Sequence, residues 1–403
     1  MKLAIVLSHP TQYYSPWFRW LAQHTALKLR VFYLWNFGVT EQRDPQFQTA
    51  FKWDLDLLSG YEHEFVPNVA QRPGTEHFFG LRNPKLISQL GAWSPNAILM
   101  FGYNSPSHLR TLAWATRRRI PVLFRGDSHF LGRGVPSWRS RTILRILYSR
   151  FAAFLPVGRA NTEYFTTLGV PASKLFFAPH AVYDRHFDPN LPNYAAAADS
   201  LRRQLGIARR EQVVLFAGKL VPHKGPKQLL QAFSRAGVSS AHLVFVGDGG
   251  EKAELESIVQ REQIARVHFL PFANQTEMPA RYLLADLFVL PSRSHYETWG
   301  LAVNEAMHMG APALVSDLVG CHADLVVPGE TGWVFAAFDE AALSTTLRRA
   351  LEELAKPDAR ERFRRAVQAR AGLYSYAAAA AGLQRALRFV SPAAFNDVTT
   401  IAP

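Results

Sequence analysis

The sequence predicts an α/β protein built from two doubly wound domains. Short apolar segments of strand length alternate with amphipathic segments of helix length, which is the pattern of strands covered by helices. The alternation stops near residue 190 and begins again near residue 213. The length of 403 residues also exceeds what a single hydrophobic core usually supports. We therefore expect domains at 1–185 and 186–373, followed by a helix and tail at 374–403.

The first half begins with an apolar run at residues 2–7. We interpret this run as a strand and not as a signal peptide, because it is short and soon interrupted. Residues 44–73 are less regular, and we expect a small antiparallel excursion there. The remaining strands are expected at 29–35, 97–101, 121–125 and 153–157, and the helices at 16–24, 84–91, 108–118 and 138–150.

The second half repeats the alternation. Residues 190–199 are flanked by proline, rich in alanine and poor in charge, so we interpret them as a hinge. A last helix is expected at 376–388. In doubly wound sheets ligands bind beyond the carboxyl ends of the strands, so two facing domains place a ligand between them. Strands are expected at 213–217, 242–247, 267–270, 286–290 and 313–316, and helices at 225–235, 251–262, 279–284 and 301–309.

The composition indicates a globular protein of a reducing compartment. Apolar residues make up 48% of the chain. Cys321 is the only cysteine, so no intrachain disulfide can form. No uninterrupted apolar run approaches the ~20 residues of a membrane span. We expect a cytoplasmic protein, with the inner face of a membrane as an alternative location.

Positive charge is concentrated in the first half. Residues 1–190 hold 22 Lys and Arg against 11 Asp and Glu, and residues 110–159 hold 11 arginines and a single acid, Asp127. Anionic lipid, a phosphorylated acceptor or nucleic acid are candidate partners, and a solvated basic face is the alternative. Residues 138–151 combine an apolar stripe with arginines. This stripe either docks on an anionic membrane or packs on the sheet, and we favour packing because the sheet needs covering helices.

Two glutamates flank a predicted helix start in the second half. Glu297 precedes the helix that begins near Gly300, and Glu305 lies in its second turn. The first backbone N–H groups of such a helix, at Gly300, Leu301 and Ala302, attract anions. The carboxylates would repel a phosphate, so we interpret them as acceptors for hydroxyl groups on either side of it. A diphosphate between a sugar and a ribose fits, which indicates a nucleotide-sugar site.

A second cluster follows the strand at 213–217. Gly218 permits close approach of the backbone, and Lys219 and Lys224 lie five residues apart. If the leaving group is a nucleoside diphosphate and no metal is bound, fixed cations must neutralise its charge, and lysines suit that role. The alternative is that both are ordinary surface lysines.

Taken together, the two clusters resemble family-4 glycosyltransferases of the GT-B fold, retaining enzymes that use nucleotide-diphospho-sugars. The spacing of Glu297 and Glu305 matches that family's Glu, seven residues, Glu pattern. The resemblance covers roughly residues 155–335. Further matching segments lie at 179–187, 246–249, 285–292, 297–312 and 329–332.

The resemblance implies a role for each matching residue. Glu297 would bind hydroxyls of the donor sugar and Glu305 the ribose, while Lys219 and Lys224 would stabilise the leaving phosphate. Phe272 lies where relatives touch the base, although ordinary core packing is an equal alternative. The resemblance also implies that the last helix crosses back to the first domain, and that neither a metal nor a cofactor is needed. The implied donor-binding set is Gly218, Lys219, Lys224, Phe272, Gly300, Leu301, Ala302 and Glu305, and the implied catalytic set is Glu297, His129 and Lys224.

The first half departs from the family pattern. Relatives often carry a Gly-Gly loop after the first strand, whereas residues 8–16 contain no glycine. His9 and Gln12 are candidates to hydrogen-bond substrate there, with packing as the alternative for His9. Arg125 and Asp127 are expected to pair with each other or with substrate. Cys321 replaces a usual glycine and is expected to pack or to narrow the donor pocket.

The leading interpretation is a retaining glycosyltransferase that moves a hexose-type sugar from a nucleotide-diphospho-sugar to an acceptor held mainly by the first domain. UDP is the favoured nucleotide, and GDP and ADP stay open. The charge suggests a lipid-linked or otherwise anionic glycan acceptor. One alternative is a sugar-nucleotide epimerase of the same fold, and another is a non-catalytic adaptor. No nucleic-acid partner is expected, because no basic motif interleaved with aromatic residues stands out.

Overall fold

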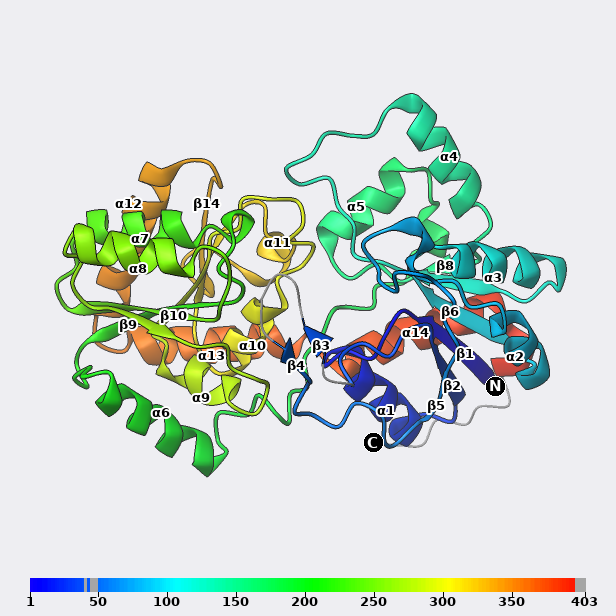
Figure 1. The fold of residues 1–403 in the computed structure, drawn as a ribbon, viewed down its shortest axis with the longest axis horizontal. Coiled ribbons are helices and arrows are strands. Elements are labelled where there is room, and N and C mark those ends of the chain that lie inside the picture. Colours follow the sequence, from blue (N-terminus) through cyan, green and yellow to red (C-terminus); the bar gives the residue numbers. More distant parts are fainter. Residues whose placement is uncertain (40–41, 44–49, 396–403) are drawn as a thin grey trace.

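The computed structural model describes residues 1–39, 42–43 and 50–395, and it contains two parallel six-stranded sheets (Figure 1). In each sheet the strand order reverses beside the first strand, which is the doubly wound arrangement predicted from the sequence. The first sheet has the order β5 (Glu62–Phe65), β2 (Lys28–Tyr33), β1 (Lys2–Leu7), β6 (Ala97–Phe101), β7 (Val122–Arg125) and β8 (Ala153–Phe154). The second has the order β11 (Val267–Leu270), β10 (Ala241–Val246), β9 (Gln212–Ala217), β12 (Leu287–Leu290), β13 (Ala313–Ser316) and β14 (Gly332–Phe335).

Helices follow most strands and cover the sheets. With the first sheet lie α1 (Tyr14–His24), α2 (Leu86–Trp93), α3 (Pro106–Arg117), α4 (Trp138–Tyr148) and α5 (Arg159–Thr167). With the second lie α6 (Pro192–Gln204), α7 (Pro226–Ala236), α8 (Lys252–Arg261), α9 (Met278–Leu284), α10 (Leu301–His308), α11 (His322–Leu325), α12 (Glu340–Leu354) and α13 (Ala359–Gly372). The chain ends with α14 (Tyr376–Val390) and α15 (Pro392–Phe395), and short 3-10 turns lie at η1 (Phe78–Gly80), η2 (Ala172–Lys174) and η3 (Pro222–Lys224).

Both faces of each sheet are buried, which explains why the strands are continuously apolar. In β1, Leu3 and Ile5 belong to the core on one face, while Ala4 and Val6 belong to the core on the other. The second sheet is likewise enclosed between two cores. Apolar runs of this kind are short and bounded by turns. The strands expected from them therefore begin and end within three residues of the observed bounds.

The helix α14 crosses back to the first sheet, as the resemblance implied. Its residues Leu383 and Leu387 are fully buried in the same core as Leu3 and Ile5. Figure 1 shows α13 beneath the second sheet and α14 continuing toward the first. Gly382 permits this contact, because a Cβ there would lie 2.1 Å from the carbonyl oxygen of Phe177.

The predicted hinge at 190–199 is wrong, since these residues lie largely within α6. Pro192 occupies the first turn, where proline's missing N–H costs nothing. The alanine run that follows has high helix propensity, and Tyr194 and Ala198 bury one face of the helix. The low charge reflects a helix packed against α9, not a flexible linker.

The irregular region at 44–73 is only partly as expected. Short strands β3 (Gln42–Arg43) and β4 (Ala50–Phe51) pair in antiparallel fashion, and residues 44–49 between them lie outside the described part. The sequence did not reveal β5, a parallel edge strand of the first sheet. Its sequence Glu-His-Glu-Phe has no buried residue and so lacks an apolar signal.

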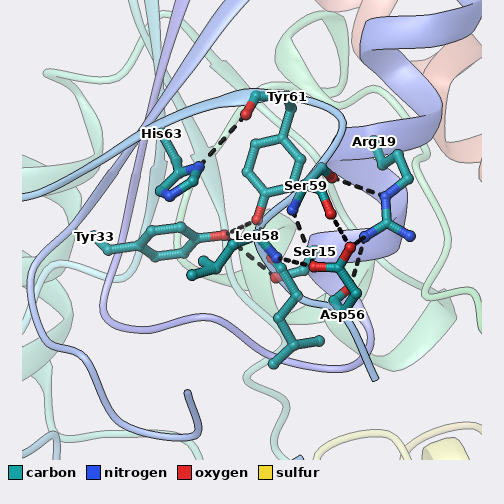
Figure 2. Close-up of polar contacts among 9 residues, drawn as sticks. Ser15, Arg19, Tyr33, Asp56, Leu58, Ser59, Tyr61 and His63 are labelled. Atoms are coloured by element: carbon teal, nitrogen blue, oxygen red, sulfur yellow. Dashed lines mark hydrogen bonds and ion pairs between the residues drawn. The ribbon is translucent and has the colours of Figure 1, made fainter. Parts of the chain in front are cut away.

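A polar network fastens the segment before β5 to α1 (Figure 2). The guanidinium of Arg19 donates to the carbonyl oxygens of Asp56 at 2.6 Å and Ser59 at 2.8 Å. The hydroxyls of Tyr33 and Tyr61 lie 2.7 Å apart in the same network. These contacts hold the segment that carries Trp53 and Asp54 toward the second domain.

The apolar stripe at 138–151 is split between the core and the surface. Leu144 and Leu147 pack on the core of the first sheet, as expected. Trp138, Ile143 and Ile146 are exposed instead. Within the described residues, no helix is long and apolar enough to span a bilayer.

Candidate functional site

A cavity of about 760 Å³ lies where the carboxyl ends of the two sheets face each other. Its walls come from loops that follow β1, β7, β9 and β12, so it lies at the switch points of both sheets. From the first half it is lined by His9, Thr11, Gln12, Tyr13, Phe37, Trp53, Asp127 and His180. From the second half its lining includes Gly218, Lys219, Lys224, Phe272, Gln275, Tyr282, Glu297, Gly300, Leu301, Ala302 and Glu305.

A glycine allows the loop that carries Lys224 to approach the loop that carries Glu297. Gly225 adopts φ +73°, and a Cβ there would lie 2.5 Å from the carbonyl oxygen of Pro291. The backbone N–H of Arg293 donates to the carbonyl oxygen of His223 at 2.8 Å. This close approach places Lys224 beside Glu297.

Glu297 is held by a cation and a hydroxyl. Its Oε2 accepts hydrogen bonds from Nζ of Lys224 and from Oγ of Ser292, the latter at 2.9 Å. The side chain is mostly buried but lines the cavity. Lys224 therefore compensates the buried carboxylate while it lies within reach of the cavity.

The start of α10 forms the floor between the two glutamates. Gly300 has φ +95°, and a Cβ there would lie 2.8 Å from Cγ1 of Val319. No side chain caps the first turn. Leu301 and Ala302 line the cavity, so the cavity meets the positive end of the helix dipole.

Glu305 is the most deeply buried carboxyl of the site. Its Oε2 accepts a hydrogen bond from the hydroxyl of Tyr282 at 2.7 Å. Burial raises the pKa of Glu305 to about 7, although nearby Tyr282, Tyr13 and Gln275 lower it in part. Near neutral pH this carboxyl is therefore poised between its charged and uncharged forms.

His9 forms an uncharged part of the first domain's wall. Burial lowers its pKa to about 4. Its ring meets Trp35 and Phe37 edge-on, with centroids 5.6 and 5.3 Å away. Oγ of Ser8 lies 3.0 Å from Nδ1. His9 thus packs among aromatic rings while it lines the cavity; a hydrogen bond from His9 to substrate stays a prediction.

Asp127 joins the two domains next to Glu297. Its Oδ2 accepts a hydrogen bond from Oγ1 of Thr298 at 2.8 Å and lies 3.6 Å from Nε2 of His180. Burial alone would raise the pKa of Asp127, but His180 and Thr298 outweigh burial and lower it to about 2. Burial also lowers the pKa of His180. The pair is therefore an ionised carboxylate beside a neutral imidazole.

Two predicted site residues do not line the cavity. His129 is buried behind it, with Nε2 3.4 Å from the carbonyl oxygen of Glu297, and its Nδ1 accepts the N–H of Leu131. The guanidinium of Arg125 donates to the carbonyl oxygens of Ala178 at 2.7 Å and Pro179 at 3.0 Å. Arg125 thus supports the backbone before His180 and does not pair with Asp127.

Phe272 and Cys321 also have defined places. Phe272 lines the cavity, and its N–H donates to Oδ2 of Asp248 at 2.9 Å. Cys321 is fully buried next to Gly300, and burial raises the pKa of its thiol. Among the described residues, no group of three or more His, Cys, Asp or Glu side chains is placed to hold a metal ion.

Sequence reasoning missed Tyr13, Tyr282 and His180. Tyr13 and Tyr282 come from different domains and meet at Glu305, which no local pattern reveals. His180 had a signal, because it stands where the matched segment 179–187 usually has asparagine.

The basic excess of the first half faces away from the cavity. The described residues of this half that line the cavity include no lysine or arginine. They are mainly aromatic or uncharged polar side chains with one carboxylate. The cations of the cavity, Lys219 and Lys224, both come from the second domain.

Comparison with known proteins finds similarity to glycosyltransferases. Residues 198–370 match the family described as glycosyl transferases group 1. A D-inositol 3-phosphate glycosyltransferase of Corynebacterium efficiens is 31% identical over 171 residues, 40% of each chain. A GDP-mannose-dependent alpha-(1-6)-phosphatidylinositol monomannoside mannosyltransferase of Mycobacterium tuberculosis is 29% identical over 310 residues, 72% of this chain and 74% of that protein.

The chain spans 31% to 43% of the length of three curated relatives, among them the Corynebacterium efficiens protein. A solved structure of Anabaena HepE in complex with UDP and glucose resembles nearly the whole chain. It has a TM-score of 0.70 at 19% identity and covers 96% of this chain and 99% of that one. The two facing Rossmann-like domains are thus the GT-B fold expected from the sequence.

Proposed function

We propose, from the match of residues 198–370 to the glycosyl transferases group 1 family, that this chain is a retaining glycosyltransferase of the family-4 type. It transfers a hexose-type sugar from a nucleotide-diphospho-sugar to a hydroxyl group of a glycan. The observation that carries this proposal is the placement of Glu297 and Glu305 on either side of the N-terminus of α10 in one cavity.

The donor lies along the second domain's wall. Glu305 accepts hydrogen bonds from the ribose hydroxyls, and the N–H groups at the start of α10 bind the diphosphate. Lys219 and Lys224 neutralise its charge without a metal ion. Phe272 contacts the base. UDP is the favoured nucleotide, as bound in HepE, and GDP, named in the mycobacterial relative, is the alternative.

The chemistry needs few protein groups. The bond between the sugar C1 and the phosphate oxygen breaks while the acceptor oxygen bonds to C1 on the same face. The acceptor proton passes to the leaving phosphate oxygen, which Lys219 and Lys224 stabilise. Glu297 binds hydroxyls of the transferred sugar and keeps Lys224 in position. No protein nucleophile is required.

The acceptor lies against the first domain's wall. Asp127 is ionised and lies one hydrogen bond from Thr298, the neighbour of Glu297. It is thus placed to orient an acceptor hydroxyl together with neutral His180. Phe37 and Trp53 offer apolar faces on which sugar rings stack. Because the described residues of this wall include no lysine or arginine, we take the reacting end of the acceptor to be an uncharged sugar.

A thermal-shift screen with UDP, GDP, ADP and their sugars identifies the donor, since a ligand at about 100 times its Kd stabilises the folded chain by ~2.7 kcal/mol. With that donor and a sugar acceptor, NMR of the glycoside formed should show the anomeric configuration of the donor. EDTA should leave the rate unchanged. Inverted product, or epimerised donor without an acceptor, would contradict the proposal.

A further inference from the structure

The surface of α4 carries apolar side chains that face solvent. Trp138 and Ile143 are each 66% exposed and Ile146 is 59% exposed, while Val135 in the preceding turn is 53% exposed. Most large apolar side chains of the chain are buried, so this clustering within twelve residues is unusual. We call Val135, Trp138, Ile143 and Ile146 the outer face of α4. The opposite side of the helix already packs on the core.

Arginines surround this outer face. Arg139, Arg145 and Arg150 are exposed, and Arg139 lies over the ring of Trp138 at 5.3 Å. Between residues 110 and 159 the only acid is Asp127, which is turned into the cavity. Among the described residues of the first half, the ion pairs lie elsewhere, at Arg19, Arg30 and His180. The arginines of α4 are thus available to an external anion.

We propose that the outer face of α4 docks on an anionic membrane surface. Tryptophan and isoleucine enter the interfacial region while arginine keeps its guanidinium at the headgroups, which is how interfacial amphipathic helices bind lipid. A protein partner or a second copy of the chain would match the apolar residues. The surrounding positive charge without neighbouring acids favours a polyanionic surface instead.

The chain connects this face directly to the cavity. Asp127 precedes Trp138 by eleven residues, so the two lie within ~40 Å of each other. Within this segment Gly132 approaches Leu318 of the second domain, since a Cβ on Gly132 would lie 3.0 Å from that side chain. Docking therefore holds the membrane surface within about 40 Å of Asp127, so a lipid-linked glycan anchored there can extend toward the cavity. The docking itself does not depend on the proposed function.

Sedimentation of the full-length protein with vesicles tests the apolar contribution. Binding should be strong to phosphatidylcholine vesicles that contain about a third phosphatidylglycerol and weak to phosphatidylcholine alone. The double substitution Trp138→Ser with Ile146→Ser should weaken binding at least about ten-fold, because these side chains no longer bury apolar surface. Phe338→Ser with Leu373→Ser is the matched control, since both side chains are equally exposed on the second domain.

Charge reversal tests the electrostatic contribution. Arg139→Glu with Arg145→Glu should lower binding at least about 25-fold, at roughly five-fold per arginine near an anionic surface. Arg209→Glu with Arg210→Glu changes the net charge equally on the other domain and should have little effect. All variants should keep the wild-type melting temperature and nucleotide binding.

The proposal would be overturned if the charge-reversed variants of α4 and of Arg209 and Arg210 bound anionic vesicles equally. It would also be overturned if the wild type bound neutral and anionic vesicles equally. A different result would assign the outer face of α4 to self-association. In that case the wild type would not bind vesicles but would form a concentration-dependent dimer, and the variant with Trp138→Ser and Ile146→Ser would not dimerise. If the wild type binds no nucleotide, the proposed function is contradicted, but the result with vesicles still holds.

Discussion

Single residues set the chemistry of the cavity, and Glu305 shows how. Its carboxyl is enclosed with Tyr282 and Tyr13, and burial raises its pKa to about 7. A ligand that offers two hydroxyl donors favours the charged form. The raised pKa of Glu305 also means that the folded protein holds the proton of this carboxyl more tightly than the unfolded chain does. The contribution of Glu305 to the free energy of unfolding is therefore most favourable below pH 4.5 and declines as the pH rises to about 7.

Nucleotide binding should therefore depend on pH. Affinity is expected to rise as the pH increases from 5.5 to 7.5 and then to level off, because ionised Glu305 accepts both ribose hydroxyls whereas the protonated form accepts fewer. Titrations across this range in the wild type measure the effect. In Glu305→Gln the affinity should be lower and the slope lost, and an unchanged slope in that variant would assign the titration to another group.

The two glutamates should fail in different ways. Glu305→Ala is expected to weaken nucleotide binding at least about ten-fold, since charge-assisted hydrogen bonds contribute about 1.5–3 kcal/mol. Glu297→Ala should mainly lower kcat, because the Glu297 carboxylate binds the transferred sugar and holds Lys224. Steady-state kinetics with binding titrations separate these effects. Equal and mild effects from both substitutions would refute the assigned roles.

The sequence predicted the residues whose function depends on local spacing. Glu297, Gly300 and Glu305 lie on one strand–loop–helix unit, so their relative positions follow from their spacing. Tyr13 and His180 reach the same cavity only because two domains pack together, and no spacing within one unit encodes that. His129 illustrates the converse, because its position after a strand did not show that its ring turns behind the cavity.

At the scale of elements, the N-terminus of α10 depends on one glycine. Gly300 has a positive φ and no room for a Cβ. Gly300→Ala should destabilise the fold by about 1–3 kcal/mol and weaken nucleotide binding, because the first turn must shift. Gly237→Ala is the control, with φ +66° but open space around it. Calorimetric melting should show a larger loss for Gly300→Ala, and equal losses would mean that crowding at Gly300 is unimportant.

Elements with a strong apolar pattern were predictable, and those without one were not. The strand β1 buries both faces and was located from its run alone. The edge strand β5 has no such run, and the alanine run of α6 has the low charge of a linker but the propensity of a helix. In α4 the apolar stripe was visible, but which of its residues meet the core depends on how the helix sits on the sheet.

The two domains meet through polar contacts around the cavity, and Val157 and Val182 of the first half also pack in a core of the second domain. Asp54 accepts a hydrogen bond from the N–H of Thr276 at 3.1 Å, and Thr298 donates to Asp127. On another side, the N–H of Arg159 donates to Asp324 at 3.0 and 3.2 Å. Each of these hydrogen bonds to a carboxylate contributes about 1.5–3 kcal/mol, and we expect the domains to separate and close during turnover.

Loosening these contacts should affect turnover more than donor binding. Asp54→Ala with Thr298→Val is expected to increase the radius of gyration of the free protein in small-angle scattering and to lower kcat. Nucleotide affinity should change less than about two-fold, because the donor wall belongs to one domain. Glu62→Ala is the control, since its ion pair with Arg30 lies at the edge of the first sheet. A large loss of affinity would mean that both domains bind the nucleotide.

The central claim is that the cavity between the domains binds a nucleoside diphosphate through Glu305 and the start of α10. Isothermal titration of UDP, with GDP and ADP in parallel, into the wild type and Glu305→Ala at about pH 8 tests it most directly. We expect one of the three to bind the wild type with a Kd below about 1 mM, or roughly −4 kcal/mol, and to bind the variant at least ten-fold more weakly. No binding of any of the three, or equal binding to both proteins, would contradict it.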